Sequence, residues 1–490
     1  MRNTPAWSIF PALLTIVFFI MTGCKKEPTS NSPGQNPGGG SNNAPGPFVV
    51  SLAASSWDSA KITWTKSTDP DNDPVEYKVY LNNILKAEHV TDLSYTFRNL
   101  TELTLYSVKI AAQDPKLKET ISGLNFTTAK YWLKFLRKLE YGPITGYSSQ
   151  KTGQMVKAND GGYIIVGDSQ LGDWPYGTIN MFTMKIDSLG NKIWQQRYNY
   201  SAGNTDNVRI VNCNNGYVIC GDYDLMKIDN NGNLVWHRDY LLSGVMTGIG
   251  VGADGSVYAT GYASVGPGTS VSATLDKYDQ FGNTLWRKTF LRTTREEFHD
   301  IKIYSDNEII VAGQTGEPDT DFWVLKINSD GNILWEKSYH DQGSAFMKNI
   351  IKTREGNYVF TGFSLGAYVI PYFYLQMIDA SGNNIWTYYV NDNNTKAYSV
   401  AETNDNSLVV AGGYQLTYSA QSALYKFDKS GNKIWGKLYP EFATYLFNKT
   451  VIPTSDGGYL INAQKGKAYN NFPETDQIYL FKTDDKGEFN

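Results

Sequence analysis

Short, mostly apolar runs, each introduced by a polar turn, fill the chain from about residue 153 onward. The turn begins with Asp, Asn or Glu, usually beside a Gly, and the run after it ends at Gly or Ala. A polar, glycine-containing turn ahead of such a run is the strongest short-range signal of a β-hairpin. Seven copies are present, at residues 160–167, 214–221, 254–261, 306–313, 355–362, 405–412 and 456–463.

A second phrase, Asp-x-x-Gly-Asn-x-x-Trp, follows these copies and recurs every 42 to 56 residues, although the sequence stops before the tryptophan of the seventh copy. The two phrases together predict four strands per repeat, joined by two short uniform turns and two connections of variable length. A four-stranded unit of this size, repeated seven times, predicts a β-propeller with one blade per repeat. The second phrase begins at Asp187, Asp229, Asp279, Asn328, Asp379, Asp428 and Asp484.

The two ends of the repeat region complement each other. The sequence stops at Asn490, before the seventh repeat has its fourth strand, and residues 132–141 precede the first repeat and look like a spare outer strand. We therefore expect residues 132–141 to complete the last blade, which leaves no open sheet edge in the ring. A solenoid is the alternative, but it would not account for a missing strand at one end and a surplus strand at the other.

The residues that recur in the second phrase are expected to be structural. Gly190 and its equivalents allow a left-handed backbone in the turn, and Asp187 and its equivalents can accept hydrogen bonds from turn amides. The recurring tryptophans are expected to dock between neighbouring blades as large apolar side chains. They are Trp194, Trp236, Trp286, Trp335, Trp386 and Trp435.

A different β-rich module precedes the repeats. Residues 47–128 alternate apolar and polar positions in short runs separated by turn clusters, as in a β-sandwich. The residues that carry a family resemblance are Trp64, the pair Leu100 and Tyr106, and the segment 126–128. In these residues the module resembles a fibronectin type III domain. The resemblance implies a core position for Trp64 and a tyrosine corner formed by Tyr106.

The start of the chain has the features of an exported protein. An apolar run from Phe10 to Met21 follows Arg2, and it is too short to span a bilayer but fits a signal peptide. The residues that end at Cys24 resemble a bacterial lipobox, which implies cleavage before Cys24 and lipidation of that cysteine. Lys25 and Lys26 follow it, as in lipoproteins sent to the outer membrane. An ordinary secretory signal with a chance cysteine is the alternative.

Pro, Gly, Ser and Asn dominate the segment after Cys24, which predicts a flexible tether. Membrane contact is then expected through the lipid anchor alone, at the outer membrane, on either its periplasmic side or the cell surface. The predicted fold class is all-β, a sandwich followed by a seven-bladed propeller. The predicted organisation is a signal peptide at 1–23, a tether at 24–46, a fibronectin type III-like domain at 47–128 and the propeller at 129–490.

The amino-acid composition agrees with an all-β protein and limits the classes of partner that we expect. Tyr, Phe and Trp together number 68 in 490 residues, and these residues favour half-buried strands. A net charge of −4 argues against nucleic acid, which needs a basic face. Cys213 and Cys220 lie at unequal distances from the turn between them, so we expect small buried side chains rather than a disulfide. We expect a monomer.

The repeat resembles the tryptophan-docking repeat of quinoprotein-like propellers. It is closer to the seven-bladed repeat of surface lipoproteins in Bacteroidota-type bacteria, where fibronectin modules are common. The resemblance covers residues 153–490 and implies a fold and an envelope location, but it says little about activity. The adjacent cysteine pair of the quinone enzymes is absent, so no cofactor is predicted.

No catalytic residue and no metal site are predicted. His299, with Arg295, Glu296 and Glu297, is the local group most like the base and neutralising charges of a polysaccharide lyase, but we expect it to be a solvated loop. The carboxylates between residues 69 and 73 fit a calcium ligand set or an Asx-rich turn, and the sequence lacks the Gly and Glu of an EF-hand loop.

Binding is expected on the variable connections, because function concentrates on variable loops held by a rigid scaffold. Aromatic residues on these connections fit contacts with sugar rings or with the hot spots of a protein interface. The alternative is that they only pack within a tyrosine-rich protein. Trp174 is the strongest candidate because it lies in a polar loop beside Pro175. The candidate ligand-binding residues are Trp174, Tyr176, Tyr368, Tyr372, Tyr414, Tyr418, Tyr469 and Phe472.

These features predict a lipid-anchored envelope protein that binds a glycan or another envelope protein without catalysing a reaction. Two alternatives remain open: a carbohydrate-active lyase or hydrolase on a propeller scaffold, and a structural component of an envelope complex.

Overall fold

The computed structural model describes residues 42–139, 149–171, 178–200, 203, 207–240, 244–265, 270–316, 319–340, 343–365, 370–389, 394–415, 420–439, 446–465 and 477–489. The chain divides into two compact units, Met1–Tyr131 and Trp132–Asn490. In the described part, no helix has the length and apolar character needed to cross a bilayer. The lipidation candidate Cys24 lies outside the described residues.

The first unit is a sandwich of two antiparallel sheets. Its core contains Trp64, which is 4% exposed, and the hydroxyl of Tyr106 accepts a hydrogen bond from Thr101 N at 2.8 Å. The expected core tryptophan and tyrosine corner are therefore confirmed. One sheet has the order β1 (Val50–Ser55), β2 (Ala60–Trp64), β5 (Ser94–Phe97), and the other has the order β4 (Ile84–Val90), β3 (Glu76–Leu81), β6 (Leu105–Gln113), β7 (Glu119–Thr127).

The acidic segment of this unit forms a turn. Asp69 Oδ1 accepts a hydrogen bond from Asp71 N at 2.8 Å, and Lys116 Nζ lies 3.1 Å from Asp73 Oδ2. These contacts fit an Asx-rich turn.

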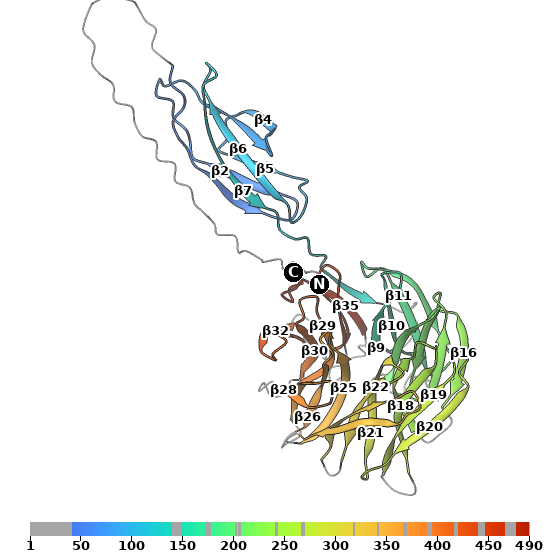
Figure 1. Ribbon diagram of the computed structural model, residues 1–490. Coiled ribbons are helices and arrows are strands. Elements are labelled where there is room, and N and C mark those ends of the chain that lie inside the picture. Colours follow the sequence, from blue (N-terminus) through green and yellow to red (C-terminus); the bar gives the residue numbers. More distant parts are fainter. Residues whose placement is uncertain are drawn as a thin grey trace, which may run out of the picture. The chain divides into compact units, whose positions relative to one another are not determined.

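The second unit contains seven four-stranded antiparallel sheets in a ring (Figure 1). The innermost strands are β9 (Ser149–Lys157), β13 (Arg209–Cys213), β17 (Gly244–Val251), β21 (Glu296–Ser305), β25 (Ser344–Lys352), β29 (Thr395–Glu402) and β33 (Leu446–Pro453). The second strands are β10 (Tyr163–Leu171), β14 (Gly216–Cys220), β18 (Val257–Ser264), β22 (Glu308–Thr315), β26 (Tyr358–Leu365), β30 (Leu408–Gln415) and β34 (Tyr459–Lys465).

The third and outermost strands complete each blade. The third strands are β11 (Thr178–Ile186), β15 (Asp224–Ile228), β19 (Val271–Tyr278), β23 (Asp321–Ile327), β27 (Pro371–Ile378), β31 (Ala420–Phe427) and β35 (Gln477–Thr483). The outermost strands are β12 (Lys192–Arg197), β16 (Leu234–Asp239), β20 (Thr284–Phe290), β24 (Ile333–Tyr339), β28 (Asn384–Tyr389), β32 (Lys433–Tyr439) and β8 (Phe135–Leu139). The predicted all-β fold of a sandwich and a seven-bladed propeller is confirmed.

The early strand completes the last blade, as the sequence predicted. The seventh sheet has the order β33-β34-β35-β8, and Leu139 pairs with Ile478. Each sheet is open, and the ring closes where β9 packs against β33. Asn462 Nδ2 also donates to Thr152 Oγ1 at 2.8 Å, which joins the last blade to the first.

A ring of hydrogen bonds joins the innermost strands. In five blades one side chain accepts a hydrogen bond from a backbone amide of the next blade, at distances of 3.0 to 3.3 Å. Because a buried amide without a partner is costly, this contact fixes each blade against its neighbour. The acceptors are Gln154, Asp300, Asn349, Ser399 and Thr450.

The recurring tryptophans dock on the next blade, but they are half-buried and not fully buried. A Cβ added at Gly382 would lie 3.0 Å from the Trp335 ring, and Trp335 Nε1 donates to Ala380 O at 3.1 Å. The tryptophan thus needs a glycine opposite it and satisfies its own N–H on the same turn. The fully buried core between blades consists of other aromatics, such as Phe322 and Tyr374, whose ring centroids are 4.2 Å apart.

Phe135 takes the tryptophan position in the seventh blade. It pairs with Lys482, as Trp435 pairs with Lys426 one blade earlier. A Cβ added at Gly190 would lie 2.7 Å from the Phe135 ring. The seventh docking contact therefore exists, with phenylalanine in place of tryptophan.

The two cysteines of the propeller, Cys213 and Cys220, are free, as expected. Cys213 pairs with Gly216 beside the turn, whereas Cys220 pairs with Arg209 at the other end of the hairpin. Burial raises the pKa of Cys220 to about 12, so this thiol stays protonated and packs as a small apolar side chain.

The Asp-x-x-Gly-Asn turns are closed by their aspartates. Asp229 Oδ1 accepts from the amides of Asn231 and Asn233 at 2.8 Å each, and Asn233 Nδ2 donates to Asp229 Oδ2 at 2.9 Å. Hydrogen bonds from the asparagine side chain and the turn amides lower the pKa of Asp229, and of Asp279 and Asp428 in the equivalent turns. The ionised form is therefore the one that the fold stabilises.

The propeller should lose stability in acid. Since these aspartates have folded pKa values below their unfolded value of about 3.9, their contribution is complete above that value and is lost as the pH falls through the folded values. We expect a nearly constant unfolding temperature from about pH 7 to about pH 5 and a decline below about pH 4. Asp279→Asn should make the decline shallower, and an unchanged slope in that variant would contradict this account.

Candidate functional site

The connections of each blade lie on two different faces. The turn from the first to the second strand and the turn from the third to the outermost strand are short and share one face. The other two connections share the opposite face, here called the variable face, and their lengths differ between blades. In the second blade, for example, the link between the second and third strands is only residues 221–223. This arrangement agrees with the expected one.

A polar cavity lies on the axis of the ring. It contains about 520 Å³ not filled by atoms, some of it open to solvent. Residues from six of the seven innermost strands line it, so it is the central channel of the propeller. Positions that are far apart in the sequence therefore face one space.

Among the described residues, three cationic side chains line the channel. Arg209, Lys348 and Lys449 belong to the second, fifth and seventh blades, and all are partly exposed. Lys449 Nζ lies 5.3 Å from the ring centroid of Tyr398, which also lines the channel. We call Arg209, Lys348 and Lys449 the channel cations. Like charges that face one cavity favour an anionic occupant, because an anion relieves their mutual repulsion.

One carboxylate also reaches the channel, but the fold already uses it. Asp300 lies 2.6 and 2.8 Å from Lys302 Nζ, and it accepts from Asn349 Nδ2 at 2.8 Å and Ile350 N at 3.0 Å. Lys302 therefore places a positive charge directly beside Asp300.

The His299 group is not a solvated loop, and that prediction was wrong. Glu296 and Glu297 are 0% and 6% exposed and begin the innermost strand β21, and His299 follows on the same strand. Thr293 N and Oγ1 each donate to Glu296 at 2.6 Å, so this carboxylate closes the preceding turn. The strand buries these residues against the neighbouring blades.

Glu297 and His299 form a pair beside the channel. His299 Nε2 lies 3.2 Å from Glu297 Oε2, and Arg295 Nε donates to Glu297 Oε1 at 2.9 Å. Burial lowers the pKa of His299, Glu297 opposes this, and the charges of Lys348 and Arg209 lower it further. The net effect favours the neutral imidazole, which is the form that a general base needs.

Two of the eight candidate aromatics fall in the described part. Tyr372 pairs with Ser364 near the start of β27, and Tyr414 pairs with Gln421 near the end of β30. Both are partly exposed at strand ends that border the variable face. The other candidates lie outside the described residues: Trp174, Tyr176, Tyr368, Tyr418, Tyr469 and Phe472.

The channel cations were not among the predicted site residues, although the repeat contains a signal for them. In six of the seven repeats, the residue seven positions before the polar turn that introduces the apolar run lies on the innermost strand. Aligning the repeats by this offset would have brought together His299, Lys348, Tyr398 and Lys449. This offset does not identify Arg209, because the turn between the first and second strands of its blade is shorter.

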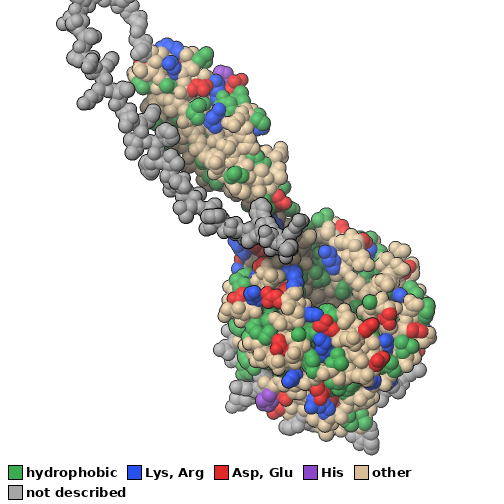
Figure 2. All heavy atoms as spheres, viewed as in Figure 1, with side chains coloured by type: hydrophobic (Ala, Val, Ile, Leu, Met, Phe, Trp, Pro, Cys, Tyr) green, Lys and Arg blue, Asp and Glu red, His purple; other side chains and the backbone are tan. Residues whose placement is uncertain are grey.

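The channel cations are not part of a broadly basic surface. Figure 2 shows basic and acidic side chains interspersed over the visible face of the propeller. With a net charge of −4 for the chain, the convergence of three cations on one cavity is a local feature.

Two family models match the chain. One is described as outer membrane protein assembly factor BamB and matches residues 221–469, and the other is the fibronectin type III domain and matches residues 43–122. No curated protein matches the chain.

Similar solved structures include the WD40 domain of Neurospora crassa Pan2, with 11% identity, a TM-score of 0.45 and coverage of 68% of this chain and 89% of that chain. A protein of unknown function from Bacteroides caccae has 16% identity, a TM-score of 0.36 and coverage of 54% and 87%. The PQQ-bound aldose sugar dehydrogenase of Streptomyces coelicolor has 10% identity, a TM-score of 0.36 and coverage of 55% and 91%. The BamB model spans just over half of the sequence, and the chain therefore belongs to the family described as outer membrane protein assembly factor BamB.

Proposed function

We propose that this protein is a non-enzymatic binding protein of the cell envelope whose propeller recognises a glycan carrying carboxylate or sulfate groups. The observation that carries the proposal is the convergence of Arg209, Lys348 and Lys449 on one axial cavity. Cations fixed on a rigid scaffold bind an anionic group with little loss of conformational freedom, because they are already in place.

The surroundings of the channel cations support a sugar ligand. Tyr398 offers an aromatic face inside the channel, and Gln154 offers an amide group. The amide of Asn349 also lines the channel, but it already bonds to Asp300 and Val400. Sugar rings combine an apolar C–H face with hydroxyl groups, so an aromatic ring beside amides and cations matches an acidic sugar. Tyr372 and Tyr414, at strand ends on the variable face, would extend this contact beyond the channel.

We also propose that the protein is located at the outer membrane. Lipidation at Cys24 would anchor the chain at the outer membrane, and the tether and fibronectin type III domain would act as spacers between the membrane and the propeller.

The proposal is tested by calorimetric titration of the purified chain without its signal segment. The probes are an oligogalacturonate and a neutral oligosaccharide of the same length, each at low and high salt. We expect binding of the acidic probe only, and weaker binding at high salt because ions screen the attraction. Equal binding of both probes, or no binding of any acidic glycan on an array, would remove the proposal.

A role as a structural component of an outer-membrane assembly complex is the second candidate. The family match favours it, since the matching model describes an outer membrane assembly factor. Recovery of one stoichiometric partner from envelope extracts, with no glycan binding, would replace the first proposal by this one.

Glu297 and His299 favour a third candidate, a carbohydrate-active enzyme. A neutral imidazole near Lys348 and Arg209 has the parts of a base beside charge-neutralising groups. Prolonged incubation with the acidic polymer distinguishes the two: a binding protein leaves the chain length unchanged, whereas a lyase produces unsaturated ends that absorb ultraviolet light.

A further inference from the structure

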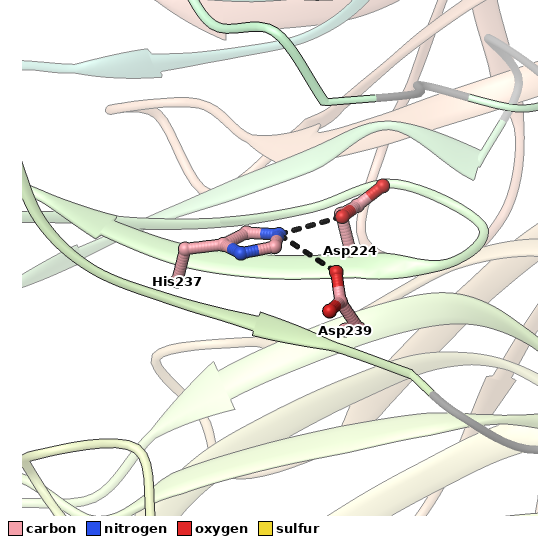
Figure 3. Close-up of side chains that lie close together, drawn as sticks. All are labelled: Asp224, His237 and Asp239. Carbon is pink, nitrogen blue, oxygen red and sulfur yellow. Dashed lines mark hydrogen bonds and ion pairs between the residues drawn. The ribbon is translucent and has the colours of Figure 1, made fainter.

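Two aspartates and a histidine meet at one edge of the second blade (Figure 3). Asp224 is the first residue of β15 and Asp239 is the last residue of β16, and the two are direct cross-strand partners. His237 precedes Asp239 by two residues and therefore lies on the same side of the strand. Its Nε2 lies 2.6 Å from Asp224 Oδ1 and 3.5 Å from Asp239 Oδ1.

The trio places two carboxylates beside one imidazole. Like charges directly opposite each other in an antiparallel pair are destabilising, and one imidazole supplies at most one positive charge to two carboxylates. The other histidine–carboxylate pairs among the described residues, such as His340 with Asp321, have an ion-pair contact with only one carboxylate. The contact of His237 with a second carboxylate, that of Asp239, thus distinguishes this group from those pairs.

The trio is also held in place. The Tyr200 ring stacks on the His237 ring with centroids 3.6 Å apart and an interplanar angle of 9°. The Asp224 and His237 side chains are 8% and 15% exposed, whereas Asp239 is 69% exposed. Packing therefore fixes the side chains of Asp224 and His237, whereas the side chain of Asp239 is open to solvent.

We propose that Asp224, His237 and Asp239 bind one divalent cation through one imidazole nitrogen and two carboxylate oxygens. Their donor atoms lie within 4.8 Å of one another, and no other trio of His, Cys, Asp or Glu in the described ranges does so. Zinc takes such ligands at about 2.0–2.2 Å, which needs donors roughly 3–4 Å apart. A small widening of the contact between Asp224 and His237 would admit the ion.

The ligand set indicates the class of metal and its use. One nitrogen and two oxygens suit Zn²⁺ or Mn²⁺ better than Ca²⁺, which takes six to eight oxygens. Three protein ligands leave coordination positions for water or an external anionic group. Because β15 begins and β16 ends at the variable face, a bound ion would stand on the same face as the connections of variable length.

The test uses the chain without its signal segment and without a histidine tag, stripped of metal with a chelator. Calorimetric titration with ZnCl₂ and, separately, MnCl₂ gives the stoichiometry, and the spin-resonance signal of Mn²⁺ reports its coordination independently. We expect one site per chain. Asp239→Asn should weaken binding by at least about tenfold, and the variant should fold normally because this side chain is exposed.

His340→Gln and Asp321→Asn are the matched controls, because they change a histidine–aspartate pair that lacks the second carboxylate. They should leave metal binding unchanged. No saturable binding, or binding that Asp239→Asn leaves intact, would overturn the proposal and leave the trio as a hydrogen-bonded contact between His237 and Asp224 beside an exposed Asp239. Neither result depends on whether the propeller binds glycans.

Discussion

Leu139→Asp should strongly destabilise the propeller, whereas Leu136→Asp should leave it nearly unchanged. Both residues lie on β8, but Leu139 is 7% exposed and Leu136 is 43% exposed. Losing a buried leucine side chain costs roughly 2–5 kcal/mol, and burying an unpaired carboxylate adds to that cost. Displacing β8 would also leave the edge of β35 unpaired, which favours aggregation.

Denaturant unfolding and size-exclusion chromatography measure this difference. We expect a lower midpoint and soluble aggregates for Leu139→Asp, and a midpoint close to the wild-type value for Leu136→Asp. Equal midpoints for the two variants would mean that β8 does not close the ring.

Replacing two channel cations should abolish most of the binding of an acidic glycan. Lys348 and Lys449 are on different blades and face the same cavity. A hydrogen bond to a charged group contributes about 1.5–3 kcal/mol, so each replacement should weaken binding by tenfold or more. We expect the double variant Lys348→Gln/Lys449→Gln to bind an oligogalacturonate at least about 100-fold more weakly and to lose most of its salt dependence.

Lys429→Gln/Lys437→Gln is the matched control, since it removes two positive charges outside the channel. Its partners are Glu355 and Glu488, and Lys429 is 63% exposed. The control should bind like the wild type, and the unfolding temperatures of both double variants should agree with that of the wild type. If the control weakens binding as much as the channel variant, the attraction comes from overall charge and not from the channel.

The blade architecture was predictable because each hairpin is local in the sequence. The polar turn before an apolar run and the Asp-x-x-Gly-Asn turn each set one strand reversal, and the phrase around Asp229 shows why, since its aspartate closes the turn with its own neighbours. Pairing of residues 132–141 with the last blade was predictable from edge protection. The side chain that docks in the last blade was not predictable. It is Phe135, and the strand register that places it there depends on packing against Gly190.

The channel was harder to predict because its residues come together only when the ring closes. Lys348 and Lys449 are about one hundred residues apart, and nothing in their immediate neighbours marks them as partners. His299 was misassigned to a loop because charged residues surround it, although strand β21 buries them. His237 and Asp239 lie only two positions apart in the sequence, but Asp224 joins them only through the register of β15 and β16.

A solved complex of the chain with an oligogalacturonate tests the central claim most directly. Our account predicts a sugar carboxylate in the channel, in contact with at least two of Arg209, Lys348 and Lys449, with the rest of the ligand extending toward the variable face. A ligand on the face of the short turns, or on the fibronectin type III domain with an empty channel, would contradict it.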